Sequence, residues 1–246
     1  MFSVKKITGM KKAMTKTMTE ALSIPSFTFS DSMNATRLLA LRKELKKVHT
    51  NLTMLPFFIK ACSIAMSEFP VMNAHIDNDL DADGYIQRYV LKHDHNFSIA
   101  IDSPDGLTVP NIKAIQNKSI LQINADLKDL SARAANGGLV KADFDDGTFS
   151  VSSVGNIGGK YFVPTILRPQ AAIIAIGRAS RVAHLVDDDK APDGYRIEKA
   201  DEIGFSISSD HRVIDGATCA RFAARMKDLI ENPNLMMLSM HWLPAK

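Results

Sequence analysis

The chain has 246 residues, 46% of them hydrophobic and 23% charged, so it can bury the core of one large domain and is neither disordered nor fibrous in composition. Lys and Arg number 30 against 27 Asp and Glu, which excludes the dominant cationic face of a nucleic-acid-binding protein. The longest apolar stretches, at 53–60 and 171–176, are far shorter than the roughly 20 residues that cross a bilayer. The sequence therefore predicts a soluble domain that does not bind nucleic acid or span a membrane.

The first part of the chain is predicted to be mostly helical. Apolar residues recur with helical or alternating period in four segments, which we assign as helices at 7–21, 34–48 and 55–69 and a strand at 26–30. Met10, Met14 and Met18 are spaced four apart, which predicts a methionine stripe that packs into the core or against another subunit. Phe57 and Phe58 are predicted to have the same role.

The remainder is predicted to be rich in strands, with two further helices. Strands are expected at 85–91, 97–102, 106–112, 147–155, 170–177 and 197–208, and helices at 119–135 and 216–231. A polar insert at 187–194 separates the last two strands. Cys62 and Cys219 lie in apolar segments far apart, which favours reduced, packed thiols over a disulfide. Together the elements predict one mixed α/β domain.

His211 is the strongest candidate for chemistry among the seven histidines. The chain lacks a G-x-G-x-x-G loop, a Walker A loop and a Cys/His cluster at zinc spacing, so we predict neither a nucleotide nor a metal site. His211 stands between a predicted strand and a predicted helix, and a neutral imidazole suits the abstraction of a thiol proton. The residues alone leave open an alternative, in which Asp210, Arg212 and Asp215 form a salt-bridge cluster around a structural histidine.

The segment Ser208–Gly216 resembles the H-x-x-x-D-G signature of the dihydrolipoyl acyltransferases and of chloramphenicol acetyltransferase. Segments of similar sequence follow one another along nearly the whole chain: Gly9–Met18, Ile24–Phe27, Leu55–Phe58, Asp105–Asn111 and Gly147–Ser152. Within that family, Leu41–Lys46, Val213–Thr218 and Glu231–Pro233 look most like the branched-chain 2-oxo acid dehydrogenase member. The resemblance implies a chloramphenicol-acetyltransferase-like fold, a mixed sheet with flanking helices.

The resemblance also implies the reaction, which is transfer of an acyl group between a dihydrolipoyl thiol and coenzyme A. His211 would be the base, Ser152 would donate a hydrogen bond to the tetrahedral oxyanion, and Asp215 belongs to the catalytic signature. One well-placed donor to an oxyanion contributes about 3 kcal/mol. From the residues alone, Ser152 could instead cap the following turn, and Asp215 could cap the following helix.

Contacts to coenzyme A are also carried over from the family. The matching positions are Arg42, Thr53, Asp102, Ser131, Ser152, Ser153 and Gly177. Without the resemblance, Arg42 would be read as a solvated helix residue, and Lys11 and Lys12 are read that way in either case.

The family implies partners as well. Its members form homotrimers with active sites between subunits, and for branched-chain members the trimers join into a cubic 24-mer core that binds decarboxylase and dihydrolipoyl dehydrogenase components. We expect residues 1–246 to be one catalytic core domain, with lipoyl and peripheral-subunit-binding domains lying outside it. No targeting segment is recognised, and the expected compartment is the mitochondrial matrix in a eukaryote or the cytoplasm in a bacterium. The rival functions are a catalytically silent scaffold of the same fold, an acetyl-specific family member, and an acetyltransferase for a free small molecule.

Overall fold

A computed structural model describes residues 2–77, 80–104, 106–155 and 157–239. Asp105, the first residue of the Asp105–Asn111 motif, and the side chain of Met10 therefore lie outside the described part. The helices are α1 (Gly9–Ala21), α2 (Thr36–Leu45), α3 (Leu55–Glu68), α4 (Ile120–Ala135) and α5 (Gly216–Glu231). Short 3-10 turns lie at Pro70–Asn73, Ile115–Asn117, Lys141–Asp143 and Pro233–Ser239. None of the described helices is long and apolar enough to cross a membrane.

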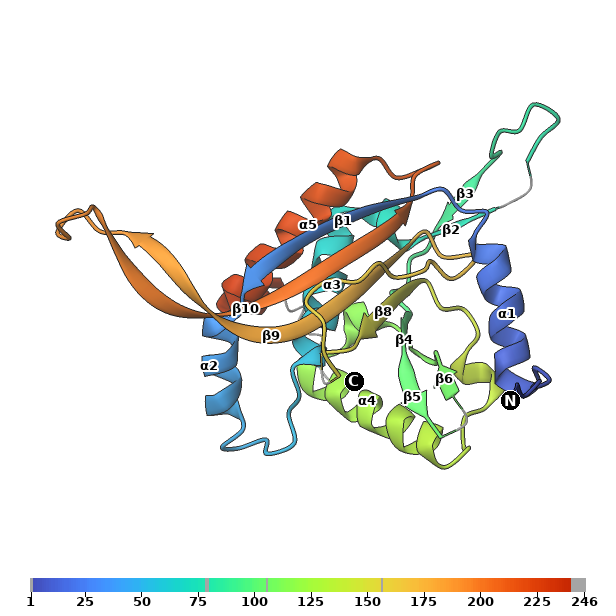
Figure 1. The fold of residues 1–246 in the computed structure, drawn as a ribbon, viewed down its shortest axis with the longest axis horizontal. Coiled ribbons are helices and arrows are strands. Elements are labelled where there is room, and N and C mark those ends of the chain that lie inside the picture. Colours follow the sequence, from blue (N-terminus) through green and yellow to red (C-terminus); the bar gives the residue numbers. More distant parts are fainter. Residues whose placement is uncertain (1, 78–79, 105, 156, 240–246) are drawn as a thin grey trace.

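A six-stranded mixed sheet organises the fold (Figure 1). Its strand order is β1 (Ser26–Asn34), β10 (Tyr195–Asp210), β9 (Ala172–Asp187), β8 (Phe149–Ser153), β4 (Phe97–Ile99) and β7 (Asn111–Ile112). Strand β8 runs parallel to both of its neighbours, and the other pairs are antiparallel. Two small ribbons join β2 (Ala74–Ile76) to β3 (Tyr89–Leu91) and β5 (Ile101–Ser103) to β6 (Gly106–Thr108). The predicted mixed α/β class is confirmed.

The main core lies between the sheet and helices α3, α4 and α5. Helix α3 is buried from Pro56 to Met66, because it packs against α4 and α5 and shares the main core with residues of the sheet. This burial explains its nearly continuous apolar sequence. Phe57 and Phe58 are core residues, as predicted. Lys60 is buried in the same helix, where burial lowers its pKa and its ammonium donates to three backbone carbonyls.

Helix α1 differs from the prediction of a buried methionine stripe. It lies at one side of the molecule (Figure 1), and 52% of the surface of Met14 is exposed. Burial of this stripe inside the same chain is therefore wrong for Met14, and the alternative of a subunit contact remains a prediction. The periodicity revealed an apolar face but could not show which surface covers it.

The last two strands of the sheet are longer than predicted. Beyond residue 178, β9 pairs only with β10, and the two strands project from the sheet as an arm (Figure 1). The polar segment 188–194 connects them at the tip. In the arm, Leu185 and Ile197 are register partners and are 69% and 67% exposed. Residues 178–187 of β9 were not predicted as a strand, because strand residues in a ribbon without a core alternate less clearly between apolar and polar.

Candidate active site

His211 lies at the junction between the end of β10 and the start of α5. Its backbone N–H donates to the carbonyl of Pro25 at 2.9 Å, which joins the junction to the residue before β1. The ring is tilted against Phe27, with 5.0 Å between the ring centroids. A Cβ atom on Gly216 would lie 3.0 Å from the Phe27 ring, so glycine lets the helix begin close to this aromatic pair. The predicted strand-to-helix position of His211 is thus found.

The imidazole of His211 is exposed, and its orientation is fixed by one hydrogen bond. Nδ1 lies 3.0 Å from the carbonyl oxygen of Ile214. Because a carbonyl can only accept, Nδ1 carries the proton of the neutral ring. The lone pair then lies on Nε2, which is the arrangement that a general base needs.

Asp215 is the N-cap of α5. Its Oδ1 accepts the backbone N–H of Thr218 at 2.7 Å, and hydrogen bonds from Thr218 lower the pKa of the carboxyl group. The carboxylate is exposed. Of the two roles expected for Asp215, the structure therefore shows helix capping, which fixes the start of the helix directly after the His211 turn.

Ser152 lies near the end of β8 and is half-buried. Side chains alternate along a strand, so Ser152 projects from one face of the sheet and Ser153 from the other. Within the described residues, no hydrogen bond to the Ser152 hydroxyl is found. The alternative in which Ser152 caps the following turn thus gains no support from the part of the chain that the structure describes.

One chain does not bring Ser152 and His211 together. The sheet register places Ser152 beside Ala175, and Ala175 beside Ser206 on β10. His211 follows Ser206 by five residues, and two strand spacings separate β8 from β10. At the usual rise and spacing this is about 17 Å along the strands and about 10 Å across them, or about 19 Å in total. A thiol and its oxyanion cannot contact both side chains within one chain.

Two of the residues expected to contact coenzyme A line one cavity. Ser153 and Gly177 line a cavity of about 310 Å³ between the start of α3, the end of β8 and the middle of β9. Its other lining residues are Met54, Leu55, Phe58, Gly155, Ile176, Arg178, Ala179 and Ile203. A Cβ atom on Gly177 would lie 2.2 Å from the carbonyl oxygen of Lys160, so only glycine lets the backbone of residues 159–160 pass this close to the strand.

The other expected contacts lie on elements that surround the start of α3. Arg42 on α2 donates Nε to the carbonyl of Leu52 at 3.0 Å, and the next residue, Thr53, donates to Asn124 on α4. Ser131 lies on α4, where its hydroxyl donates to the carbonyl of Leu127 at 2.7 Å.

Asp102 is exposed on β5, a strand that contacts α4. The expected residues are thus distributed over neighbouring elements, and only Ser153 and Gly177 share the cavity.

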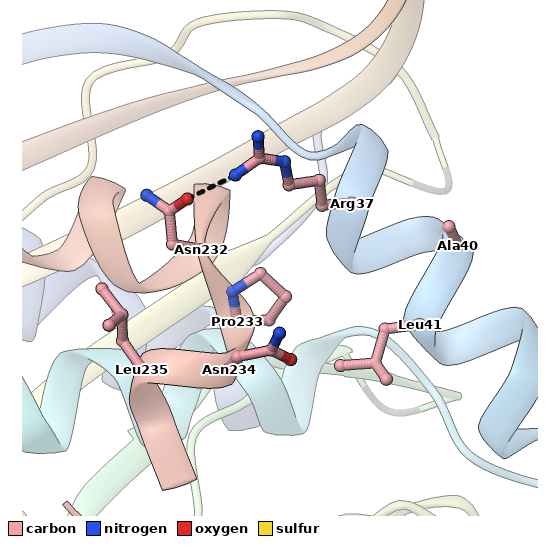
Figure 2. Close-up of a pocket in the computed structure, with 7 residues that line it drawn as sticks. All are labelled: Arg37, Ala40, Leu41, Asn232, Pro233, Asn234 and Leu235. Atoms are coloured by element: carbon pink, nitrogen blue, oxygen red, sulfur yellow. Dashed lines mark hydrogen bonds between the residues drawn. The ribbon is translucent and has the colours of Figure 1, made fainter. Parts of the chain in front are cut away.

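A larger cavity, of about 550 Å³, contains none of the expected residues. It lies between α2 and the chain that follows α5, with Arg37 donating to Asn232 at 2.6 Å across its edge (Figure 2). Leu41 faces Pro233 and Asn234 within it (Figure 2). Cavity volume alone therefore does not identify the site. The smaller cavity is the better candidate because it contains two of the expected residues, Ser153 and Gly177.

The sequence matches the 2-oxoacid dehydrogenases acyltransferase (catalytic domain) family over residues 2–238. The chain belongs to this family. The acyltransferase domain is 40% identical over 238 residues to the lipoamide acyltransferase component of the mouse mitochondrial branched-chain alpha-keto acid dehydrogenase complex. That alignment covers 95% of this chain and 47% of the mouse protein, so the chain spans about half the length of this relative.

Solved structures of acyltransferases confirm the fold. An Azotobacter vinelandii dihydrolipoamide acetyltransferase superposes with a TM-score of 0.86 at 31% identity, covering 96% of this chain and 94% of that one. The structure of the Azotobacter enzyme was solved to investigate the roles of three residues in its catalytic mechanism: a serine, a histidine, and an asparagine four positions after the histidine. The cubic core of a pyruvate dehydrogenase complex superposes with a TM-score of 0.83 at 31% identity, again over 96% and 94% of the two chains.

A chloramphenicol acetyltransferase aligns with a TM-score of 0.53 at 15% identity over 92% of this chain and 100% of that one. This similarity shows the fold alone, and it confirms the predicted chloramphenicol-acetyltransferase-like architecture of the acyltransferase domain.

Sequence reasoning missed Arg178. It follows Gly177 on β9 and lines the same cavity, and its side chain is exposed. Among the described residues its guanidinium has no hydrogen-bonding partner, whereas Arg181 on the same strand pairs with Asp201 at 3.3 Å. The sequence signal that could have identified Arg178 is its position as a basic residue directly after Gly177, an expected coenzyme A contact.

Proposed function

We propose that this domain transfers an acyl group between the thiol of a dihydrolipoyl group and coenzyme A. The observation that carries the proposal is the hydrogen bond from His211 Nδ1 to the Ile214 carbonyl, which leaves Nε2 free on an exposed ring. A thiol is a suitable proton donor for a neutral imidazole because the two groups have pKa values within about two units of each other.

The proposed reaction proceeds through a tetrahedral intermediate. Nε2 of His211 takes the thiol proton, the sulfur attacks the carbonyl carbon of the thioester, and the carbonyl oxygen becomes an oxyanion. The Ser152 hydroxyl donates to that oxyanion, and its removal is expected to slow turnover by about two orders of magnitude. The intermediate then expels the other sulfur as a thiolate, which recovers the proton from His211. Asp215 supports the base by fixing the start of α5.

The separation of about 19 Å between Ser152 and His211 implies that two copies of the chain complete each site. The proposed unit is a homotrimer in which His211 of one copy meets Ser152 of the next. Exposed apolar side chains support such an assembly, because Met14 on α1 and the Leu185–Ile197 pair on the arm are uncovered in one chain. Joining of trimers into a cubic 24-mer core is proposed by similarity to the cubic core structure.

Coenzyme A is the proposed acyl carrier on one side of the site. The cavity beside Ser153 and Gly177 has the apolar walls and small volume that suit the pantetheine arm rather than the whole cofactor. Arg178 at this cavity is proposed to contact a phosphate, since guanidinium groups bind phosphate oxygens in a two-point geometry. Arg42, Thr53, Asp102 and Ser131 remain proposed contacts for the rest of the cofactor.

The proposed acyl group is branched-chain. Identity is 40% to the mouse branched-chain component and 31% to the Azotobacter acetyltransferase, which favours this subtype over an acetyl-specific one. A silent scaffold is disfavoured because a scaffold does not need a histidine held with Nε2 free. An acetyltransferase for a free small molecule is disfavoured by the 15% identity to chloramphenicol acetyltransferase.

The remaining partners are also proposals. We propose that residues 1–246 form the catalytic core domain and that the dihydrolipoyl arm is carried by a lipoyl domain. The assembly would work with decarboxylase and dihydrolipoyl dehydrogenase components, in the mitochondrial matrix or the bacterial cytoplasm.

A steady-state assay with dihydrolipoamide and acetyl-, isobutyryl- or isovaleryl-coenzyme A tests the proposal. We expect highest turnover with a branched donor and loss of most activity in His211→Ala. Assembly should be unchanged, because one exposed side chain does not hold the fold of the chain together. A well-folded oligomer with no activity on any donor would exclude the proposed acyltransferase function. Preference for the acetyl donor would favour the acetyl-specific alternative.

A further inference from the structure

The residue before His211 places a carboxylate in the protein interior. Asp210 is 1% exposed, and its Oδ1 accepts the backbone N–H and the Nε–H of Arg212 at 3.1 and 2.9 Å. Its Oδ2 accepts Nη2 of Arg212 at 2.5 Å. The guanidinium therefore holds both carboxylate oxygens, and this contact raises the pKa of Arg212.

The backbone of Asp210 connects this ion pair to the histidine ring. Its N–H donates to the carbonyl of Ala171, next to β9, at 2.9 Å, and its carbonyl accepts the N–H of Ile214 at 2.9 Å. The carbonyl of Ile214 in turn accepts Nδ1 of His211. Contacts thus run without a break from the sheet, through Asp210 and Ile214, to the imidazole.

A buried ion pair is an expensive way to hold a turn. Asp210 is 1% exposed and Arg212 is 22% exposed, so the carboxylate loses its hydration and the guanidinium loses much of it. Apolar replacements of such pairs are often equally stable. Val213 already donates its N–H to the Asp210 carbonyl at 3.1 Å, so the backbone alone closes the turn. The charges therefore call for a role other than stability.

We propose that the Asp210–Arg212 ion pair is the positioning device of the catalytic base. It fixes the turn so that Nε2 of His211 faces the reacting thiol, and Arg212 balances a negative charge that would otherwise lie beside the imidazole. The proposal rests on the acyl-transfer function proposed above. Asp210 and Arg212 are positioning residues, since neither is assigned a contact with the substrate.

The charge balance has a testable sign. The charged side chains in the segments that surround His211 are Asp210 and Arg212 in its own turn and Asp215 at the start of α5, while residues 25–27 of the neighbouring strand bring none. An unbalanced carboxylate favours the protonated, inactive imidazole, and an unbalanced guanidinium disfavours it. Removing one charge or the other should therefore move the pH–rate profile in opposite directions.

The test compares Arg212→Met, Asp210→Asn and Arg212→Lys in the assembled protein. We expect kcat to fall about tenfold or more in the first two variants, with KM for acyl-coenzyme A nearly unchanged, because the base is misplaced rather than the cofactor. The acid limb of the profile should move about half a unit upward in Arg212→Met and about half a unit downward in Asp210→Asn.

The lysine variant separates charge from geometry. Arg212→Lys restores the positive charge without the two-point contact, so its acid limb should match the wild type while kcat recovers only partly. Arg225→Met is the matched control, because Arg225 on α5 is similarly exposed, at 29% against 22% for Arg212, and pairs with Glu68 away from the turn. Its kinetics should match the wild type.

Three results would overturn the proposal. These are wild-type kcat in Arg212→Met, shifts of the acid limb in the same direction for both charge removals, or full recovery of kcat in Arg212→Lys. If Asp210→Asn does not assemble, Arg212→Met and Arg212→Lys still test the proposal through their kcat values and acid limbs. If the wild type has no acyltransferase activity, modification of His211 by diethyl pyrocarbonate replaces the kinetic assay. Its rate, followed against pH by mass spectrometry, should shift in opposite directions for the two charge removals. This measurement separates the positioning proposal from the proposed function.

Discussion

Mixing two inactive variants tests where the catalytic site is completed. His211→Ala removes the proposed base, and Ser152→Ala removes the proposed oxyanion donor. In one chain these side chains lie about 19 Å apart by strand rise and spacing, because His211 follows the end of β10 and Ser152 is level with Ser206, two strands away. If neighbouring copies form each site, a mixed trimer can place an intact His211 beside an intact Ser152.

The size of the recovered activity follows from the geometry of a cyclic trimer. When both variants are co-expressed in equal amounts, one copy retains His211 with a probability of about one half, and its neighbour independently retains Ser152 with the same probability. About one quarter of the sites are then complete in the whole population, and about one third in the mixed trimers that both tags select. Each variant alone should retain about one hundredth of wild-type turnover or less. Differently tagged chains, purified through both tags, would be assayed with dihydrolipoamide and isobutyryl-coenzyme A.

Two controls make the result interpretable. The double variant His211→Ala/Ser152→Ala, co-expressed with wild type, reports how much activity arises from unaltered chains. Mixing the two purified single variants without co-expression should restore nothing if trimers do not exchange chains. Activity of the co-expressed single variants that stays at their separate levels would refute the two-copy site, and with it the argument from sheet register.

Three further predictions concern stability, the helix cap and the cofactor. Burial lowers the pKa of His95 to about 4, so the unfolded chain binds this proton more readily and stability is lost as pH falls from about 6.5 toward 4. Between neutral pH and pH 4.5, the free energy of unfolding should fall by about 2.5 kcal/mol more in the wild type than in His95→Gln, as measured by urea unfolding. Equal losses in the two proteins would contradict this prediction. Asp215→Asn should keep the cap and most activity, while Asp215→Ala should lower both Tm and kcat, and equal behaviour of the two would exclude capping as its role. Arg178→Ala should raise KM for acyl-coenzyme A about tenfold but not for the acyl-pantetheine thioester, which lacks the nucleotide phosphates, with Arg181→Ala as control. An equal rise with both donors would remove the phosphate assignment.

Local sequence determined much of the fold, because several signals were strong over short ranges. Helix α5 begins and ends at the predicted residues, since Asp215 caps it and Asn232-Pro233 ends it. Helix α4 follows Ser119, whose side chain accepts from Gln122 in a capping box. The strands were predicted less well. The stretch 97–112 was expected as two strands and forms four short ones, because pairing partners, and not local pattern, decide where a strand stops.

The sequence by itself determined the family, the mixed α/β class and the three catalytic candidates, because the His211 segment and its companion motifs are local strings of residues. It also indicated that α1 has an apolar face. Only the tertiary structure decided which ring nitrogen of His211 is free, what Asp215 bonds, and that Ser152 and His211 cannot meet within one chain. The first two are hydrogen bonds between residues three apart, which depend on the backbone conformation of the turn before α5. The third follows from sheet register, and none of the three leaves a periodic trace in the sequence.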